Sequence, residues 1–311
     1  MRFILSILAL FTTLCGYSQI MYDQYVNPDY AKIKSVTLRP VVKNRLSSST
    51  IGIGPENGDS LATPVMPLLG ENKGLMMDFD ILEDEIRPLQ WRIVHCDRNW
   101  RKSNLAESEY MTVVEGDFLI DGDFADLSYN TTVPYVHYFF YFPFHGGSST
   151  PNFRFLMSGN YVVQVYEVYE GEDDSSEIVL IQKRFVLTEQ LVEIQAEVKL
   201  PNLVQYMDDS QQISMKIVPH GFDLSTFDKD LYVVYRQNGR WDNTICGIQP
   251  NHVSGDGSLV FNDNRYALFK GGNEFRNFHF KNLRIATAPV DYIKKHNGKY
   301  SVYLHPDNDW H

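Results

Sequence analysis

Apolar and polar residues alternate along most of this chain with the period of two that is typical of β-strands. In the stretch Gln211–Val218, for example, Ile213, Met215 and Ile217 fall on one face. No stretch shows an amphipathic helical pattern of three turns. The alternation predicts strands over residues 33–42, 66–69, 74–80, 90–96, 135–142, 160–169, 178–187, 192–200, 211–218, 231–235, 277–285 and 300–304.

Strand–turn–strand units at this spacing, without intervening helices, indicate β-sandwiches. We predict an all-β chain with two consecutive sandwich domains of immunoglobulin- or fibronectin-like type. The first covers residues 20–188 and the second residues 189–311. Because the last predicted strand runs almost directly into His311, we expect a C-terminally truncated chain, or one that lacks a further domain, with an incomplete second sandwich.

Two runs refine this picture of the first domain. Tyr135–Phe142 is apolar on both faces, which favours a central strand between two packed layers. The strands over 160–169 and 178–187 flank an acidic stretch and predict a hairpin with a solvated tip. Aromatic residues make up 14% of the chain, which also favours strands over helices.

The first 19 residues read as a secretory signal. Arg2 supplies a positive start, Phe3–Leu14 is apolar but too short to span a bilayer, and small residues precede Gln19. No later stretch is long and apolar enough to cross a membrane, so we expect no direct membrane insertion. The net charge of −11 disfavours nucleic acid and anionic lipid surfaces as partners.

Cys96 and Cys246 remain after this segment, in different predicted domains. Export would permit a disulfide, but we favour two small buried side chains. His95 and Cys96 suggest a base and a nucleophile, yet neighbours in a strand point to opposite faces. We therefore expect a structural strand end, followed by Asp97 and anchored by Trp100.

Other candidate chemistry is weak. The acidic run with Asp117, Asp121, Asp123 and Asp126 lacks the ligand order of a calcium loop and favours a solvated loop-and-strand segment. The chain holds no nucleophile elbow, zinc-protease helix, phosphate loop or C-x-x-C pair. We predict no catalytic residue, no cofactor and no metal.

Tryptophans leave one alternative open. Trp91, Trp100 and Trp241 could form a platform for sugar stacking, or they could fill space in the core. The core interpretation is favoured because Trp91 lies inside an alternating strand.

Two unusual segments follow strand-like runs in the second half, Gln237–Asn243 and Gly271–Arg276. Asn238-Gly239 favours a tight turn with positive φ. Trp241 can then pack back on the sheet, while Arg240 and Asp242 can pair on the other face. The plain alternative is that both segments are turn chemistry without a ligand.

These segments resemble the plug protein family of the Bacteroidetes type IX secretion system. The similarity extends, in order, to further segments from Ile33 to the C-terminus, including His95–Trp100 and Ser158–Tyr161. We interpret the signature residues as structural: Asp78, Phe79, His95, Cys96, Asp97, Trp100, Gln237, Asn238, Arg240, Trp241, Asn243, Gly272, Asn273, Glu274 and Phe275. Members of this family usually continue with a further β-rich portion.

The resemblance implies a binding role and names no catalytic residue. It implies an exported, periplasmic protein that docks on the giant outer-membrane translocon barrel and seals its pore. An exported carbohydrate-binding or surface-adhesion sandwich is the alternative. An exposed row of coplanar aromatic rings would favour sugar binding, whereas a broad surface with an apolar patch would favour docking.

Overall fold

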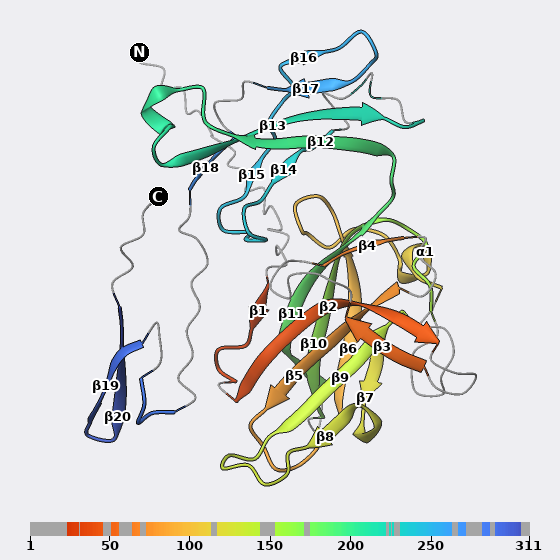
Figure 1. The fold of residues 1–311 in the computed structure, drawn as a ribbon. Helices are drawn as coiled ribbons and strands as arrows, with labels where there is room; N and C mark the ends of the chain where they lie inside the picture. Colours follow the sequence, from red (N-terminus) through yellow and green to blue (C-terminus); the bar gives the residue numbers. More distant parts are fainter. Residues whose placement is uncertain are drawn as a thin grey trace, which may run out of the picture. The chain divides into compact units, whose positions relative to one another are not determined.

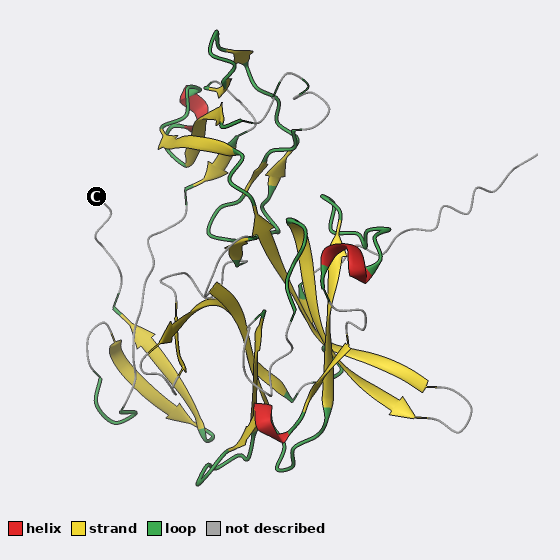
Figure 2. Cartoon of the chain, turned by 90° about the vertical axis from the view of Figure 1, so that its right-hand side faces the viewer, coloured by secondary structure: helices red, strands yellow, loops and turns green. Residues whose placement is uncertain are grey.

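The computed structural model describes residues 24–30, 32–45, 51–55, 64–68, 73–112, 117–143, 153–170, 175–221, 224, 226, 231–262, 267–271, 282–286 and 290–305. The predicted signal segment and the signature residues Gly272–Phe275 lie outside these ranges. The described chain is built from strands and loops (Figures 1 and 2). Its helices are single turns: α1 (Glu107–Tyr110), η1 (Gly122–Phe124) and η2 (Val204–Tyr206). The all-β class is confirmed, and no described helix could span a membrane.

The first half of the chain forms two mostly antiparallel sheets. One has the strand order β3-β2-β5-β9-β8. Its strands are β3 (Ile51–Pro55), β2 (Ile33–Arg45), β5 (Lys73–Ile81), β9 (Val136–Phe142) and β8 (Ala125–Leu127).

The second sheet has the order β1-β11-β10-β6-β7, with β4 added in parallel to β11. The predicted pairing of the two hairpin strands is confirmed, because β10 and β11 pair antiparallel over almost their whole length, while residues 171–174 of the predicted tip lie outside the described ranges. The strands are β1 (Tyr25–Val26), β11 (Ser175–Thr188), β10 (Gly159–Glu170), β6 (Leu89–Cys96), β7 (Asp117–Ile120) and β4 (Val65–Pro67).

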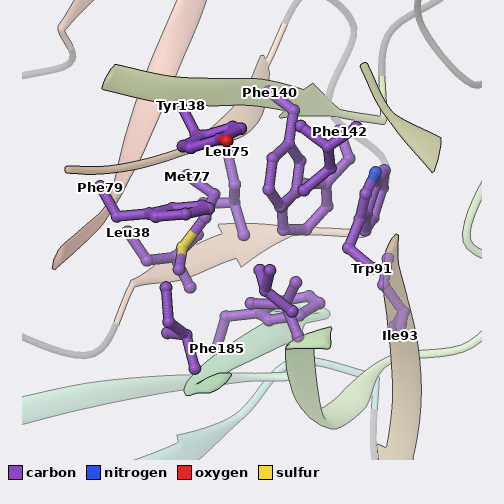
Figure 3. Packing of buried hydrophobic residues seen from close by; sticks show 14 of the residues in the cluster. Leu38, Leu75, Met77, Phe79, Trp91, Ile93, Tyr138, Phe140, Phe142 and Phe185 are labelled. Atoms are coloured by element: carbon purple, nitrogen blue, oxygen red, sulfur yellow. The ribbon is translucent and has the colours of Figure 1, made fainter. Parts of the chain in front are cut away.

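An aromatic core fills the space between these two sheets (Figure 3). Trp91 of β6 stacks on Phe140 of β9, with ring centroids 4.5 Å apart, and Phe79 stacks on Tyr138 at 5.2 Å. Trp91 is therefore a core residue, as its alternating strand predicts. Burying such large rings is the main stabilising contribution to this sandwich.

One expectation for β9 needs correction. Val136, Tyr138, Phe140 and Phe142 are fully buried, but His137, Phe139 and Tyr141 on the opposite face are only half-buried. Among the described residues, one packed layer covers this strand, and its second face is flanked by the paired strands β5 and β8 of the same sheet. The run is thus apolar on both faces without a second core.

Residues beyond Thr188 form smaller elements. A five-stranded sheet has the order β12-β13-β17-β16, with β18 paired to β13, and two ribbons pair β14 with β15 and β19 with β20. The strands are β12 (Val192–Lys199), β13 (Ser210–Pro219), β14 (Val234–Tyr235), β15 (Ile245–Cys246), β16 (His252–Val253), β17 (Leu259–Phe261), β18 (Leu268–Lys270), β19 (Val290–His296) and β20 (Lys299–Leu304).

Two strand predictions in this region are wrong in part. Of residues 231–235, only Val234 and Tyr235 are strand. The described part of the predicted strand 277–285 is turn and bend, because the Asn282 carboxamide accepts the backbone N–H of Arg284 at 2.8 Å. This local side-chain bond competes with strand pairing.

By contacts the chain divides into two compact units. One comprises the residues up to Glu197 together with Ile213–Ala267, and the other comprises Val198–Gln212 and Leu268–His311. The predicted domain boundary at residue 188 stays a prediction. Every residue of the site described next belongs to the first unit.

Candidate functional site

Three of the unusual sequence segments meet on the outer face of the β6–β10–β11 sheet. Cys96 lies opposite Asn160 in the antiparallel ladder, and the Asn160 carboxamide donates to the Asp97 carbonyl at 3.0 Å. Trp241, from the Gln237–Asn243 segment, meets Trp100 with ring centroids 5.0 Å apart. Segments more than 130 residues apart in sequence thus gather at one place.

The first of these segments is a tight turn that presents Trp100. One Asp97 carboxylate oxygen accepts the backbone N–H groups of Asn99 (2.8 Å) and Arg101 (2.9 Å). Trp100 has φ of 61°, a conformation that costs a bulky residue about 1–2 kcal/mol. Its indole is only 5% exposed. Burial of the ring therefore offsets the cost of the strained backbone.

The second segment is the turn that Asn238-Gly239 predicts. Asn238 and Gly239 have φ of 54° and 68°, and the Arg240 N–H donates to the Gln237 carbonyl at 3.1 Å. Arg240 Nε donates to an Asp242 carboxylate oxygen at 2.9 Å, and this hydrogen bond lowers the pKa of Asp242. The predicted pairing of Arg240 with Asp242 and the packing of Trp241 on the sheet are both confirmed.

Arginine side chains stack on the two indoles. The Arg184 guanidinium lies 4.6 Å from the Trp100 ring centre and 4.8 Å from that of Trp241, and Arg236 lies 4.3 Å from Trp241. Each such contact contributes about 1–2 kcal/mol when water is excluded. Arg184 is buried, and burial lowers the pKa of Arg236.

A small apolar cluster lies beneath this stack. It consists of Val94, Cys96, Trp100 and Val162, with Val186 and Trp241 packed against it. Burial, together with the nearby Asp97 charge, raises the pKa of Cys96 to about 12. Cys96 is therefore an inert core thiol, as expected.

The stack forms one side of a groove with a volume of about 1220 Å³. We call it the arginine groove and define it by Arg98, Arg184, Arg236, Arg240, Trp100 and Trp241. Arg98 and Tyr232 also line this groove, and the Arg98 guanidinium lies 5.1 Å from the centre of the Tyr232 ring. Typical pockets for small molecules are about 300–1,000 Å³, so this groove is larger than one small ligand needs.

Cys246 also lines the groove, and it corrects the expectation of two buried thiols. Its side chain is exposed because β15 belongs to a two-stranded ribbon that buries few of its side chains. Both cysteines are free.

His95 points to the opposite side of the sheet from Cys96, as strand geometry requires. Its Nδ1 lies 2.9 Å from Ser103 Oγ, and its ring meets Tyr161 edge-on with centroids 4.9 Å apart. Burial lowers the pKa of His95, against a smaller raising effect from a hydrogen bond with the Ser158 backbone. On its Nε2 side the ring faces the backbone of Ser158 and Gly159, and no carboxylate among the described residues contacts it, so these contacts hold His95 in a fixed position.

The remaining predicted site residues lie elsewhere or outside the described ranges. Asp78 accepts hydrogen bonds from Thr37 (2.8 Å) and Arg39 (3.3 Å) on the other sheet, and Phe79 is in the core. In the acidic run, Asp121 caps the backbone N–H of Asp123. Within the described ranges, no three His, Cys, Asp or Glu side chains converge as metal ligands would.

A family model described as the first domain of the type 9 secretion system plug protein matches residues 33–189. The chain belongs to this plug protein family. The match includes the His95–Trp100 turn and Arg184, whereas Trp241 and Arg236 lie beyond it. The arginine groove of this family member therefore joins the matched domain to residues that follow it.

Comparison with curated proteins gave no match. Among solved structures, the chain is similar to a hypothetical protein from Parabacteroides merdae, with 26% sequence identity and a TM-score of 0.69. The similarity covers 92% of this chain and 64% of that one, so the chain spans less than two thirds of its structural relative.

Arg184, Arg236 and Arg98 are not among the site residues that the sequence predicts. Arg184 had the clearest signal, because it is a cation in the middle of an apolar strand of the first domain. Arg98 and Arg236 stand inside or beside the signature segments but read as ordinary turn residues.

Proposed function

We propose that this plug-family protein is a non-enzymatic component of the type IX secretion system. It is exported to the periplasm, docks as a folded body on the periplasmic end of the outer-membrane translocon barrel, and seals the pore. The family match over residues 33–189 is the observation that carries the proposal. Association with the membrane is then made through this protein partner alone.

The first sandwich has the properties that such docking needs. Its aromatic core makes it a preformed body, so little conformational entropy is lost when it binds. It also exposes apolar side chains at the end of β8 and on the connection from β8 to β9: Leu127 is 55% exposed, Tyr129 88% and Val133 54%. Exposed apolar side chains in one short segment favour a protein contact.

Sugar binding is the second candidate, and the tryptophans argue against it. Trp91 is in the core and Trp100 is 5% exposed, while guanidinium groups cover the faces of Trp100 and Trp241. The one stacked pair of exposed rings is Tyr292 with Tyr303, among the residues that the structure describes. Two tyrosines are a smaller platform than a row of coplanar rings.

Affinity purification of the tagged protein from its native host tests the proposal. We expect a very large outer-membrane β-barrel protein to co-purify after mild detergent extraction. Tyr129→Ala should reduce its recovery, and Ile178→Ala, which truncates an exposed side chain on β11, should leave recovery unchanged. If the wild-type protein recovers no barrel protein while other secretion components remain associated with theirs, the docking proposal is wrong.

A further inference from the structure

We propose that the arginine groove binds an extended acidic segment of another polypeptide. This inference goes beyond pore sealing, because it assigns a peptide site whose ligand need not be the pore. It rests on the charges that line the groove, on an unsatisfied buried donor, and on the apolar side chains that line the groove together with the cations.

The charged side chains that line the groove are mostly positive, although the whole protein has a net charge of −11. Among the residues that the structure describes, four arginines line the groove, and Asp242 is the one acidic lining residue. Asp242 is already paired with Arg240. Arg98 and Arg236 have no carboxylate partner within the described part of the chain, so the groove offers uncompensated cations to an incoming anion.

The site also contains a donor that its surroundings do not satisfy. Arg236 Nη1 is buried and has no hydrogen-bond partner among the described residues. Its guanidinium is held against the Trp241 ring at 4.3 Å, so it cannot easily turn toward water. A buried donor without an acceptor is unfavourable, and a carboxylate that enters beside Trp241 would supply the acceptor.

The shape and the remaining lining favour a polypeptide as the source of the carboxylates. Val65, Val186, Ile194 and Val234 line the groove together with the arginines, and Ile194 is 61% exposed. An extended peptide that alternates acidic and apolar side chains offers both kinds of partner at the spacing of a strand. An acidic polysaccharide has no apolar side chains to cover these residues.

A labelled dodecapeptide of three Glu-Val-Asp-Thr repeats is the probe, and fluorescence anisotropy with this protein is the measurement. We expect saturable binding that weakens as salt screens the charges. The isosteric Gln-Val-Asn-Thr peptide should bind at least about tenfold more weakly, the loss expected for charge-assisted hydrogen bonds. Polygalacturonate at equal charge should compete poorly.

Arg98→Gln and Arg236→Gln should each weaken binding about tenfold. Arg101→Gln is the matched control, because Arg101 is an exposed arginine of the same turn that does not line the groove. Arg98 is exposed, so its variant remains informative if thermal unfolding shows that Arg236→Gln is destabilised. The inference is overturned if the amide peptide binds equally well, if Arg98→Gln matches Arg101→Gln, or if polygalacturonate displaces the peptide. Co-purification of the barrel protein is a separate measurement, so failure of either idea is recognised independently.

Discussion

Replacing Gly159 by alanine should destabilise the first sandwich specifically. Gly159 begins β10 with φ of 143°, a conformation that residues with a side chain rarely adopt. A Cβ atom added there would lie 2.8 Å from His95 Nε2, closer than real Cβ contacts come. The ring has little freedom to retreat, because Ser103 holds Nδ1 and Tyr161 packs against it edge-on.

Two costs therefore add in Gly159→Ala. The unfavourable backbone conformation costs about 1–3 kcal/mol, and displacement of a packed ring costs another 1–3 kcal/mol or so. We expect a loss of about 2–6 kcal/mol in the free energy of unfolding, a large share of the roughly 5–15 kcal/mol of a typical domain.

Urea unfolding followed by circular dichroism measures this loss. Gly122→Ala is the control, since a Cβ there meets nothing within 4 Å, and it should change stability by less than about 0.5 kcal/mol. A double-mutant cycle with His95→Ala separates the two costs, because removal of the ring should recover only the packing part. A Gly159→Ala protein as stable as the wild type would refute the reasoning.

Three further changes follow from the site. Trp241→Ala should lower the free energy of unfolding by about 2–3 kcal/mol through lost indole packing and stacking, and Trp241→Phe by less than half as much; equal losses in urea titrations would contradict the stacking argument. Because burial lowers the pKa of His95, the unfolded chain binds a proton near its ordinary pKa of about 6.5 that the folded chain resists, so stability should fall as pH drops through that value. His95→Gln should flatten this dependence, and unchanged pH profiles would argue against it. Iodoacetamide at mildly alkaline pH should label exposed Cys246 and spare Cys96 in the folded protein, as peptide mapping would show, and label at Cys96 would contradict its burial and its pKa of about 12.

The first sandwich could be predicted well because its strands are long and rich in apolar residues, even where both faces are buried, as over Tyr161–Tyr166 of β10. β6, β10 and β11 each bury one face in the aromatic core. The apolar residues of that face therefore recur with a period of two along the sequence. In the second half the strands are short and buried poorly, so the signal weakens. Only two residues of the predicted strand 231–235 pair, and Asn282 diverts its neighbours into a turn.

In the candidate site, contacts between neighbours in sequence could be predicted, whereas contacts between residues far apart in sequence could not. The turn at Asn238-Gly239 and the Arg240–Asp242 pair could be predicted because they depend on neighbours in sequence. The stacking of Arg184 between Trp100 and Trp241 could not, because it joins residues whose approach is set by the folded sheet. No local pattern distinguishes such an arginine from one that faces solvent.

The edge-to-face pair of Trp100 and Trp241 has an optical consequence. Two indoles with centroids 5.0 Å apart and planes at 83° hold their electronic transitions in a fixed chiral arrangement, so their excited states couple. Because each ring comes from a different turn, the resulting near-ultraviolet dichroic band exists only while the two turns are in contact. The intensity of this band therefore measures whether two widely separated parts of the family signature are in contact.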